Sequence, residues 1–418
     1  MFRDDALTTS SVTEEVLNLY TRLDFGNEFE NGMSLDGNVG LRYARAKVRG
    51  TGGRIFVDLE PGSDSFNFNP ETAAFLNQAD IDAFDEEFET QEHWLPSFNA
   101  KLNLNDESLI RLAASRNITR PRIDQLNSGQ TFVGNFQFIV DDTQQPPITT
   151  DVVPFQISQF GGNPNLQPIE SWNFDLGFEH YFGEDNFFAV TGFYKDITNN
   201  IIGTTEAVGF EELDGETLPV IFTTDRNEDS AEFLGVEVSY QHFFDELPGI
   251  WSNFGVQANY TYIDSSTNPP IPNIDTNGDG IFDASGPDGN GDGIPDSDLI
   301  SRFNLDNFLG TSDHTANLIG IYQDERFEFR LAYNFRSEFL ISRADFVTGN
   351  ALFVEDDGIF DGSAKWDVND NLQFRVQASN IFGSISEQTQ QVDLAGQRLV
   401  RARVKGDRRI KFGLRYNF

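Results

Sequence analysis

The feature that most constrains this chain is an alternation of apolar and polar residues with a period of two. It is clearest in RFEFRLAYNFR, residues 326–336, and it returns in RRIKFGLRYNF at the end of the chain. Successive side chains of a β-strand point to opposite faces, whereas helical spacing would scatter these residues around the axis. In the first segment one face holds Phe327, Phe329, Leu331, Tyr333 and Phe335, and the other holds Glu328, Arg330, Ala332, Asn334 and Arg336. The pattern predicts strands with one apolar and one polar face.

The same alternation marks thirteen segments, and most of them exceed a dozen residues. They lie near 15–25, 34–50, 90–104, 108–120, 170–182, 187–199, 232–243, 251–264, 313–322, 326–341, 357–368, 371–384 and 407–418. Ordinary strands have about 5–6 residues, whereas about 12 residues at roughly 3.3 Å each, tilted by about 45°, cross about 28 Å. That distance is close to the thickness of the hydrocarbon core of a bilayer, so the lengths suit a membrane.

Short and long connections alternate between these segments. GNEFENGM, NDES, GEDN, FDELPG, QDER and VNDN are short and polar, and longer stretches lie near 51–89, 121–169, 200–231, 265–312, 342–356 and 385–406. An outer-membrane barrel has tight periplasmic turns and long extracellular loops, whereas a soluble sandwich is not expected to separate its loops in this way. The prediction is an all-β, antiparallel, up-and-down transmembrane β-barrel, with apolar residues toward lipid and polar residues toward the lumen.

Composition narrows the possible partners. The 29 Lys and Arg against 67 Asp and Glu give a net charge of -38, which argues against binding to nucleic acid. The absence of cysteine excludes disulfides and thiolate metal sites. No run of eighteen apolar residues predicts a transmembrane helix, and the acidic start, MFRDDALTTSS, is not a secretory signal.

Several segments resemble one family, the TonB-dependent outer-membrane receptors. GNPNLQPIESWNFDLGFEHYF (162–182) and FFAVTGFYKDITNNI (187–201) are similar to paired mid-barrel strands, LIRLAASRNITRP (109–121) is similar to the preceding strand, and FLGVEVSYQHFF (233–244) with FGVQANYTYIDS (254–265) is similar to the next hairpin. The resemblance covers nearly the whole chain. It implies a receptor of the Gram-negative outer membrane that binds a small solute, contacts outer-membrane lipid and lipopolysaccharide, uses no organic cofactor and is energised by the TonB system through a plug.

The last strand resembles the signal by which the barrel assembly machinery recognises its substrates. The resemblance assigns that role to the alternating apolar residues and the terminal aromatic residue: Ile410, Phe412, Leu414, Tyr416 and Phe418.

The chain also departs from the family. Its members carry a signal, a TonB-binding segment, a plug and a barrel of about twenty-two strands. Here the first three are missing and only about thirteen strands are predicted, so residues 1–418 are expected to be the C-terminal portion of a receptor barrel. Such a fragment would have two unpaired edges and would not be functional alone.

The loop 265–312 contains the pattern D-x-N-x-D-G twice, thirteen residues apart. Alternate oxygen-bearing side chains followed by a glycine wrap the backbone around a hard cation. The predicted calcium ligands are Asp275, Asn277, Asp279, Ile281 (through its carbonyl) and Asp283, and then Asp288, Asn290, Asp292, Ile294 (through its carbonyl) and Asp296. The acid expected at the twelfth position is replaced by Gly286 and Leu299, which predicts modest affinity. The alternative is a flexible, acidic, glycine-rich loop.

Other chemistry is sparse. None of the four histidines, His93, His180, His242 and His314, accompanies a nucleophile motif, so no catalytic residue is predicted. His180 and His242 are expected in an aromatic girdle at the periplasmic end. Arg330 and Arg336 are expected to pair with carboxylates of the wall or of a plug. No residue is assigned to substrate binding.

Three functions remain open. The first is active uptake of a scarce solute, either siderophore-bound iron or an oligosaccharide. The second is a passive porin-like channel or a barrel enzyme, and the third is a calcium-binding β-protein of the cell surface.

Overall fold

The thirteen predicted segments all form strands of one large sheet. A computed structural model of the chain describes residues 11–57, 83–87, 90–127, 129–141, 148–183, 185–213, 216–267, 307–343, 350–393 and 395–418. It contains a 16-stranded sheet and a four-stranded sheet. We call the strands that match the predicted segments the wall strands: β1 (Ser11–Glu28), β2 (Ser34–Val57), β4 (Gln91–Asn103), β5 (Ser108–Thr119), β8 (Ile169–Phe182), β9 (Asn186–Leu213), β10 (Glu216–Phe243), β11 (Phe254–Thr267), β12 (His314–Gln323), β13 (Phe327–Arg336), β16 (Asp357–Asn369), β17 (Leu372–Ser379) and β20 (Arg409–Tyr416). The all-β prediction is confirmed.

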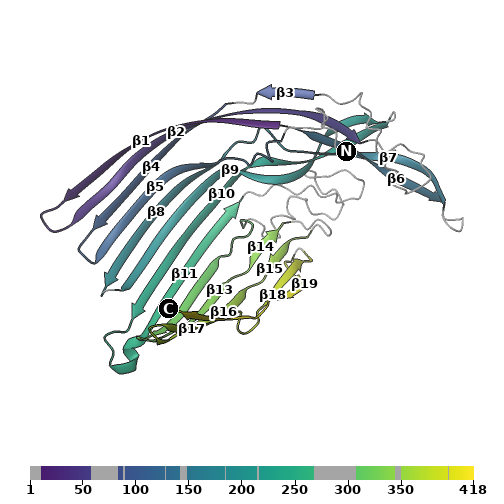
Figure 1. The fold of residues 1–418 in the computed structure, drawn as a ribbon. Helices are drawn as coiled ribbons and strands as arrows, with labels where there is room; N and C mark the ends of the chain where they lie inside the picture. The colour runs from purple at the N-terminus through teal and green to yellow at the C-terminus, as the bar shows by residue number, and fades with distance from the viewer. Residues whose placement is uncertain are drawn as a thin grey trace.

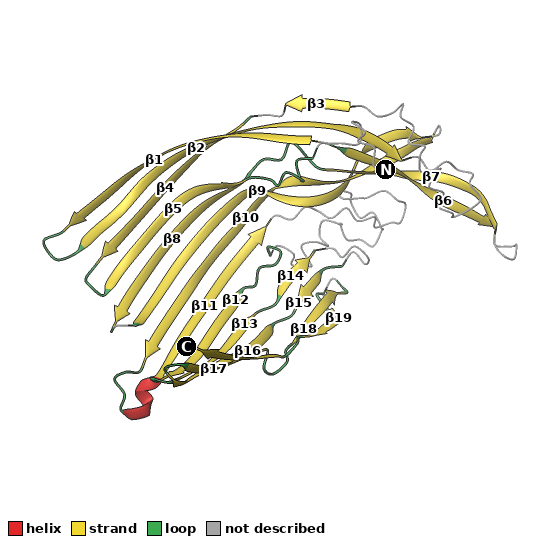
Figure 2. Cartoon of the chain, in the orientation of Figure 1, coloured by secondary structure: helices red, strands yellow, loops and turns green. Residues whose placement is uncertain are grey.

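Neighbouring wall strands pair antiparallel in the order of the chain, from β1 to β20. The short connections between wall strands lie at the same end of the strands (Figure 2). The sheet is curved and open, because β1 pairs with β2 and β20 with β17, and these two outer strands do not pair with each other (Figure 1). No helix among the described residues is long and apolar enough to cross a membrane.

Three of the short turns begin with the same side-chain contact. The Oδ1 atom of Asp324 accepts the backbone N–H groups of Arg326 and Phe327 at 2.9 and 2.8 Å. Asn105 and Asn369 accept the N–H groups two and three residues on in the same way. Asx side chains favour such turns because they supply the acceptor that the reversing backbone lacks.

The two faces of the wall differ as the alternation predicts. Rows of large apolar side chains are exposed on one face, which we call the apolar face; Val39 is 46% exposed, Leu176 58%, Leu318 51% and Leu414 64%. The opposite, polar face carries residues such as Lys101, Arg111, Arg330 and Lys411. An apolar surface of this extent is not stable in water, which fits contact with lipid.

Aromatic residues gather on the apolar face near the short turns. The His180 ring stacks on Phe182 at 5.7 Å, and Phe182 lies 5.6 Å from His242. His242 also meets Phe244 edge-on at 4.8 Å. This arrangement agrees with the predicted girdle.

The structure also contains strands that the alternation did not identify, most of them in the long connections. They are β3 (Ala83–Glu87), β6 (Gln130–Asp141), β7 (Ile148–Gly161), β14 (Phe339–Ser342, at the end of the predicted segment 326–341), β15 (Leu352–Val354), β18 (Ile385–Gln391) and β19 (Arg398–Lys405). The last four form the separate sheet, in the order β14-β15-β18-β19. The hairpin of β6 and β7 pairs in parallel with the ends of β2 and β10, so the sheet is not wholly antiparallel. These pairings join segments far apart in sequence, and so they leave no local pattern.

Two predicted segments also end early. The segment 371–384 stops at Ser379 because Asn380 takes a φ of 53°, its N–H bonding Asp361 Oδ1 at 2.8 Å. The segment 326–341 is broken after β13, where the Ser337 N–H donates to His314 O at 2.9 Å and β14 departs to the second sheet. At the start of the segment 251–264, a 3-10 helix (Gly249–Asn253) precedes β11.

Few apolar side chains are buried in the part of the chain that the structure describes, as a single layer requires. One described cluster joins Val48 of β2 with Leu126 and Leu166, which lie in the connections after β5 and before β8. Another joins Leu340, Ala351 and Phe353 in the four-stranded sheet. The wall is therefore held mainly by its backbone ladder and by cross-strand side-chain pairs.

Candidate functional site

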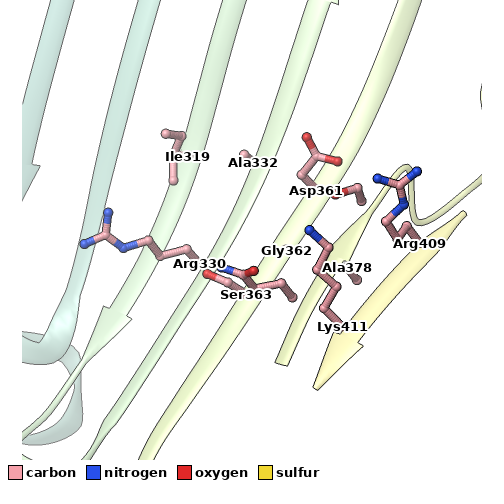
Figure 3. A pocket seen from close by; sticks show the side chains of 11 residues that line it. Ile319, Arg330, Ala332, Asp361, Gly362, Ser363, Ala378, Arg409 and Lys411 are labelled. Carbon is pink, nitrogen blue, oxygen red and sulfur yellow. The ribbon is translucent and has the colours of Figure 1, made fainter. Parts of the chain in front are cut away.

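The polar face of the last strands carries a pocket of about 350 Å³ (Figure 3). The register places Arg330, Ser363, Gln377 and Lys411 in one row across β13, β16, β17 and β20. A neighbouring row contains Ile319, Ala332 and Asp361, and Arg409 pairs with Ser379 beyond it. Residues up to 92 positions apart thus line one site because consecutive strands share a face.

Positive charge dominates this site. The surrounding polar face carries Arg330, Lys365, Arg375, Arg409, Lys411 and Arg415 against Glu328, Asp361 and Asp367. Arg330 Nε lies 2.8 Å from Glu328 Oε1, and Lys365 Nζ lies 3.2 Å from Asp367 Oδ2. Arg409 and Lys411 have no side-chain hydrogen bond or ion pair within the described residues, and their strand is exposed throughout. Two unpaired cations beside hydroxyl and amide groups can bind a carboxylate or phosphate.

The structure confirms that Arg330 pairs with a carboxylate of the wall, Glu328. Arg336 was expected to do the same, but among the described residues it has other partners. The Arg336 guanidinium donates from Nε to Ser312 Oγ at 2.7 Å and lies 3.7 Å from the centre of the Phe339 ring. It also donates to the Gly310 carbonyl. Arg336 therefore fastens the start of β14 to the wall.

Each of the four histidines has a different hydrogen-bonding or ionic partner, although His180 and His242 both contact Phe182. Ser108 Oγ is 2.9 Å from His180 Nδ1, His242 Nε2 is 3.2 Å from Glu246 Oε1, and the Tyr260 hydroxyl is 2.8 Å from His314 Nδ1. His93 lies in a cleft of its own at the far end of β4, with Nδ1 2.8 Å from Glu170 Oε1.

The sequence that forms this two-faced wall matches a family model described as "TonB dependent receptor-like, beta-barrel" over residues 5–381. The chain belongs to the TonB-dependent receptor β-barrel family. Proteins of this family are transport receptors of the Gram-negative outer membrane that interact with TonB. A comparison with curated protein sequences finds no match.

Solved TonB-dependent receptors share the fold. The ferric enterobactin receptor PfeA of Pseudomonas aeruginosa, a mutant in complex with enterobactin, matches with a TM-score of 0.53 and 13% identity, covering 97% of this chain and 55% of that chain. The ferric yersiniabactin uptake receptor FyuA of Yersinia pestis matches with a TM-score of 0.50 and 12% identity, covering 98% of this chain and 46% of that chain. The present chain thus spans about half the length of these receptors.

The predicted sites fall in different parts of the chain. The calcium motifs, Asp275 to Asp296, lie outside the described residues. The assembly-signal residues from Ile410 to Tyr416 lie on the apolar face of β20, and the N–H of Asn417 bonds Asn371 O at 2.9 Å, which places the C-terminus beside a short turn.

Sequence reasoning missed Arg409 and Lys411 as site residues because the alternation assigned them only to a polar face. One signal was present. In a chain of net charge -38, residues 398–418 contain a single acid, Asp407, and the following basic residues: Arg398, Arg401, Arg403, Lys405, Arg408, Arg409, Lys411 and Arg415.

Proposed function

We propose that this chain forms wall strands of a receptor in the Gram-negative outer membrane, and that the complete receptor actively takes up a scarce solute. The observation that carries the proposal is the two-faced wall, whose apolar rows are exposed along strands long enough to cross a bilayer. The family match supports the same function. Lipid and lipopolysaccharide would surround the apolar face.

A ferric siderophore is the solute that we favour over a neutral oligosaccharide. The pocket at Arg409 and Lys411 would attract an anionic group, and the whole chain is otherwise acidic. The neighbouring structures are receptors for ferric enterobactin and ferric yersiniabactin, which is in keeping with this choice.

Deleting the coding sequence in its host tests the function. Uptake of radioactive iron from siderophore complexes should fall, and the lost fraction should be the part that requires TonB. The passive-channel alternative replaces the proposal if the deletion abolishes uptake of neutral sugars and if the undeleted strain still takes up these sugars without TonB.

We also propose that these strands work with a plug and further wall strands, since the chain spans about half of the related receptors. The DNA that precedes the codon for Met1 tests this. A plug-coding sequence in frame, or across a frameshift, supports it, whereas a promoter and a stop codon just before Met1 contradict it.

For the loop 265–312 we propose calcium binding, on the doubled spacing of its acidic residues. Calcium should protect this loop from proteolysis. Unchanged cleavage after addition of a chelator would remove the claim.

A further inference from the structure

The turn between β10 and β11, residues 244–253, differs from the other short turns of the wall. It contains the 3-10 helix, which extends past the ends of the strands and is drawn in red in Figure 2. Three of its large apolar side chains are exposed: Leu247 at 43%, Ile250 at 64% and Trp251 at 59%. Among the described residues of the other short turns, Phe29 alone is a large apolar residue that is exposed. The turn therefore presents an apolar surface that a chain reversal does not require.

Hydrogen bonds hold this turn in one conformation and fasten it to the wall. The Ser252 hydroxyl donates to the Gly249 carbonyl at 2.7 Å, and Gly249 takes a φ of 67°, where a side chain would be strained. At the end of the helix, Asn253 Nδ2 donates to the Tyr322 hydroxyl of β12 at 3.3 Å. The exposed apolar surface thus keeps a fixed place relative to the strands.

That place is on the side of the apolar face. The Trp251 ring lies 5.6 Å from the ring of Phe254, the first residue of β11. Phe254 pairs with Tyr322, and their rings meet edge-on at 5.1 Å. The register puts Tyr322 on the same face as Leu318, four residues before it on β12. Trp251 therefore continues the apolar face beyond the ends of the strands.

Charged groups lie at the same level of the wall. His242 Nε2 is 3.2 Å from Glu246 Oε1, and both Asp245 and Glu246 are exposed. A carboxylate is costly in the hydrocarbon core of a bilayer, so this level fits the headgroup region instead. Tryptophan is enriched in that region because its ring is apolar and its indole N–H is polar. The turn thus combines the two kinds of side chain that a membrane–water boundary accepts.

We propose that residues 244–253 lie in the headgroup boundary of the periplasmic leaflet, with Ile250 and Trp251 inserted between lipids. Binding of this kind strengthens with the apolar area that enters the boundary, and the turn offers three large side chains. Lipid is chosen over a protein partner because the surface is continuous with the apolar face. The inference rests on the proposed function for the lipid contact of that face, and it adds an anchor outside the strands.

Fluorescence quenching in vesicles tests the anchor. The chain has four tryptophans, so Trp94→Phe, Trp172→Phe and Trp366→Phe together leave Trp251 as the only one. Lipids with bromine near the headgroup should quench more than half of its fluorescence, lipids with bromine at the chain ends should quench less, and iodide on both sides of the membrane should quench little. The matched control keeps Trp366 alone, on the apolar face of β16 opposite Phe327.

Ile250→Asp, made in both single-tryptophan chains, separates the turn from the wall. It should reduce the bromine quenching of Trp251 several-fold, because a carboxylate draws the turn out toward water, and it should leave the quenching of Trp366 unchanged. Should a triple replacement fail to fold, the difference in quenching between the unaltered chain and Trp251→Phe measures the same quantity.

The outcomes separate the anchor from the proposed function. If bromine quenches Trp366 while Trp251 is quenched only by iodide, the anchor is wrong and the lipid contact of the wall stands. If Trp251 is protected from both quenchers, a protein covers the turn, and the anchor is wrong again. If bromine quenches neither tryptophan, the apolar face does not meet lipid, and the proposed function fails together with the anchor.

Discussion

The side chain of Asp324 shows how a single residue stabilises a short turn. Its carboxylate accepts two backbone N–H groups, from Arg326 and Phe327, and these hydrogen bonds lower the pKa of Asp324. A carboxyl group with a lowered folded pKa stabilises the fold above its unfolded pKa, about 3.9, and that contribution disappears as the pH falls through the folded pKa. Asn369 makes the same contacts with a neutral acceptor at 3.0 Å, and so it lacks this pH dependence.

Asp324→Asn should therefore make the chain less sensitive to acid. Between pH 6 and pH 3 the wild-type chain should lose more unfolding free energy than the variant, because Asn keeps the turn contacts without titrating. Asn369→Asp is the reciprocal change and should add acid sensitivity of the same sign. Urea unfolding followed by tryptophan fluorescence measures both, and equal acid sensitivity in the wild type and Asp324→Asn would contradict the assignment.

Gly235 and Gly192 lie in adjacent strands but in different surroundings. A Cβ atom added at Gly235 would lie 2.5 Å from Tyr262 O and against the Phe193 ring, whereas one added at Gly192 would meet nothing within 4 Å. Gly235→Ala should lower the unfolding free energy by about 1–3 kcal/mol through overpacking. Gly192→Ala should be neutral or stabilising by up to about 1 kcal/mol, because it restricts the unfolded chain. Urea unfolding compares them, and equal effects would show that close packing at Gly235 is not the cause.

In β5, two adjacent residues, Leu112 and Ala113, lie on opposite faces of the wall and so allow the two faces to be compared. Leu112 lies on the apolar face between Ala100 and Leu176, and it is 45% exposed. Ala113 lies on the polar face beside Asp175. The lipid contact inferred for one face and the hydration inferred for the other predict opposite tolerance to charge.

Leu112→Arg should therefore destabilise the membrane-inserted chain by about 2–4 kcal/mol if it lies at the bilayer midplane. Ala113→Arg should have little effect, because its guanidinium can meet Asp175 in water. Urea titration in lipid vesicles provides the comparison. Equal tolerance at the two positions would mean that the apolar face does not contact lipid.

The alternation identified all thirteen wall strands and assigned their faces, because a period of two is a local property of the backbone. It did not identify the strands in the long connections. The pair β14 and β15 precedes β16 in the chain and the pair β18 and β19 follows β17, so the four strands form one sheet only because β15 pairs with β18. It placed Arg330 on the polar face but could not bring it into one row with Lys411, because that row depends on the registers of three strand pairs.

At the scale of the whole molecule, the sheet is open and ends in two outer strands, β1 and β20. β20 is exposed along its entire length, and Phe418 touches only its neighbour Tyr416, with ring centres 5.1 Å apart, among the aromatic contacts of the described residues. Packing therefore gives no reason for a terminal aromatic residue. Recognition during assembly, as proposed from the resemblance, does give one.

Phe418→Ser should reduce the amount of chain found in the outer membrane several-fold and leave its stability in detergent unchanged. Phe382→Ser is the control, since Phe382 is an exposed aromatic residue outside the last strand, at 69% exposure. Membrane fractionation measures the first quantity and urea unfolding the second. Loss of stability in Phe418→Ser would show a structural role instead.

By itself, the sequence determined the strands of the wall, their two faces and the family, since each is encoded in side chains at neighbouring positions. The tertiary structure alone decided where strands part and which charges meet. Arg409 and Lys411 acquired a pocket, and His93 met Glu170, through pairings between distant segments. The physical reason is that register and strand separation depend on the free energy of the whole hydrogen-bonded ladder, to which residues many strands away contribute.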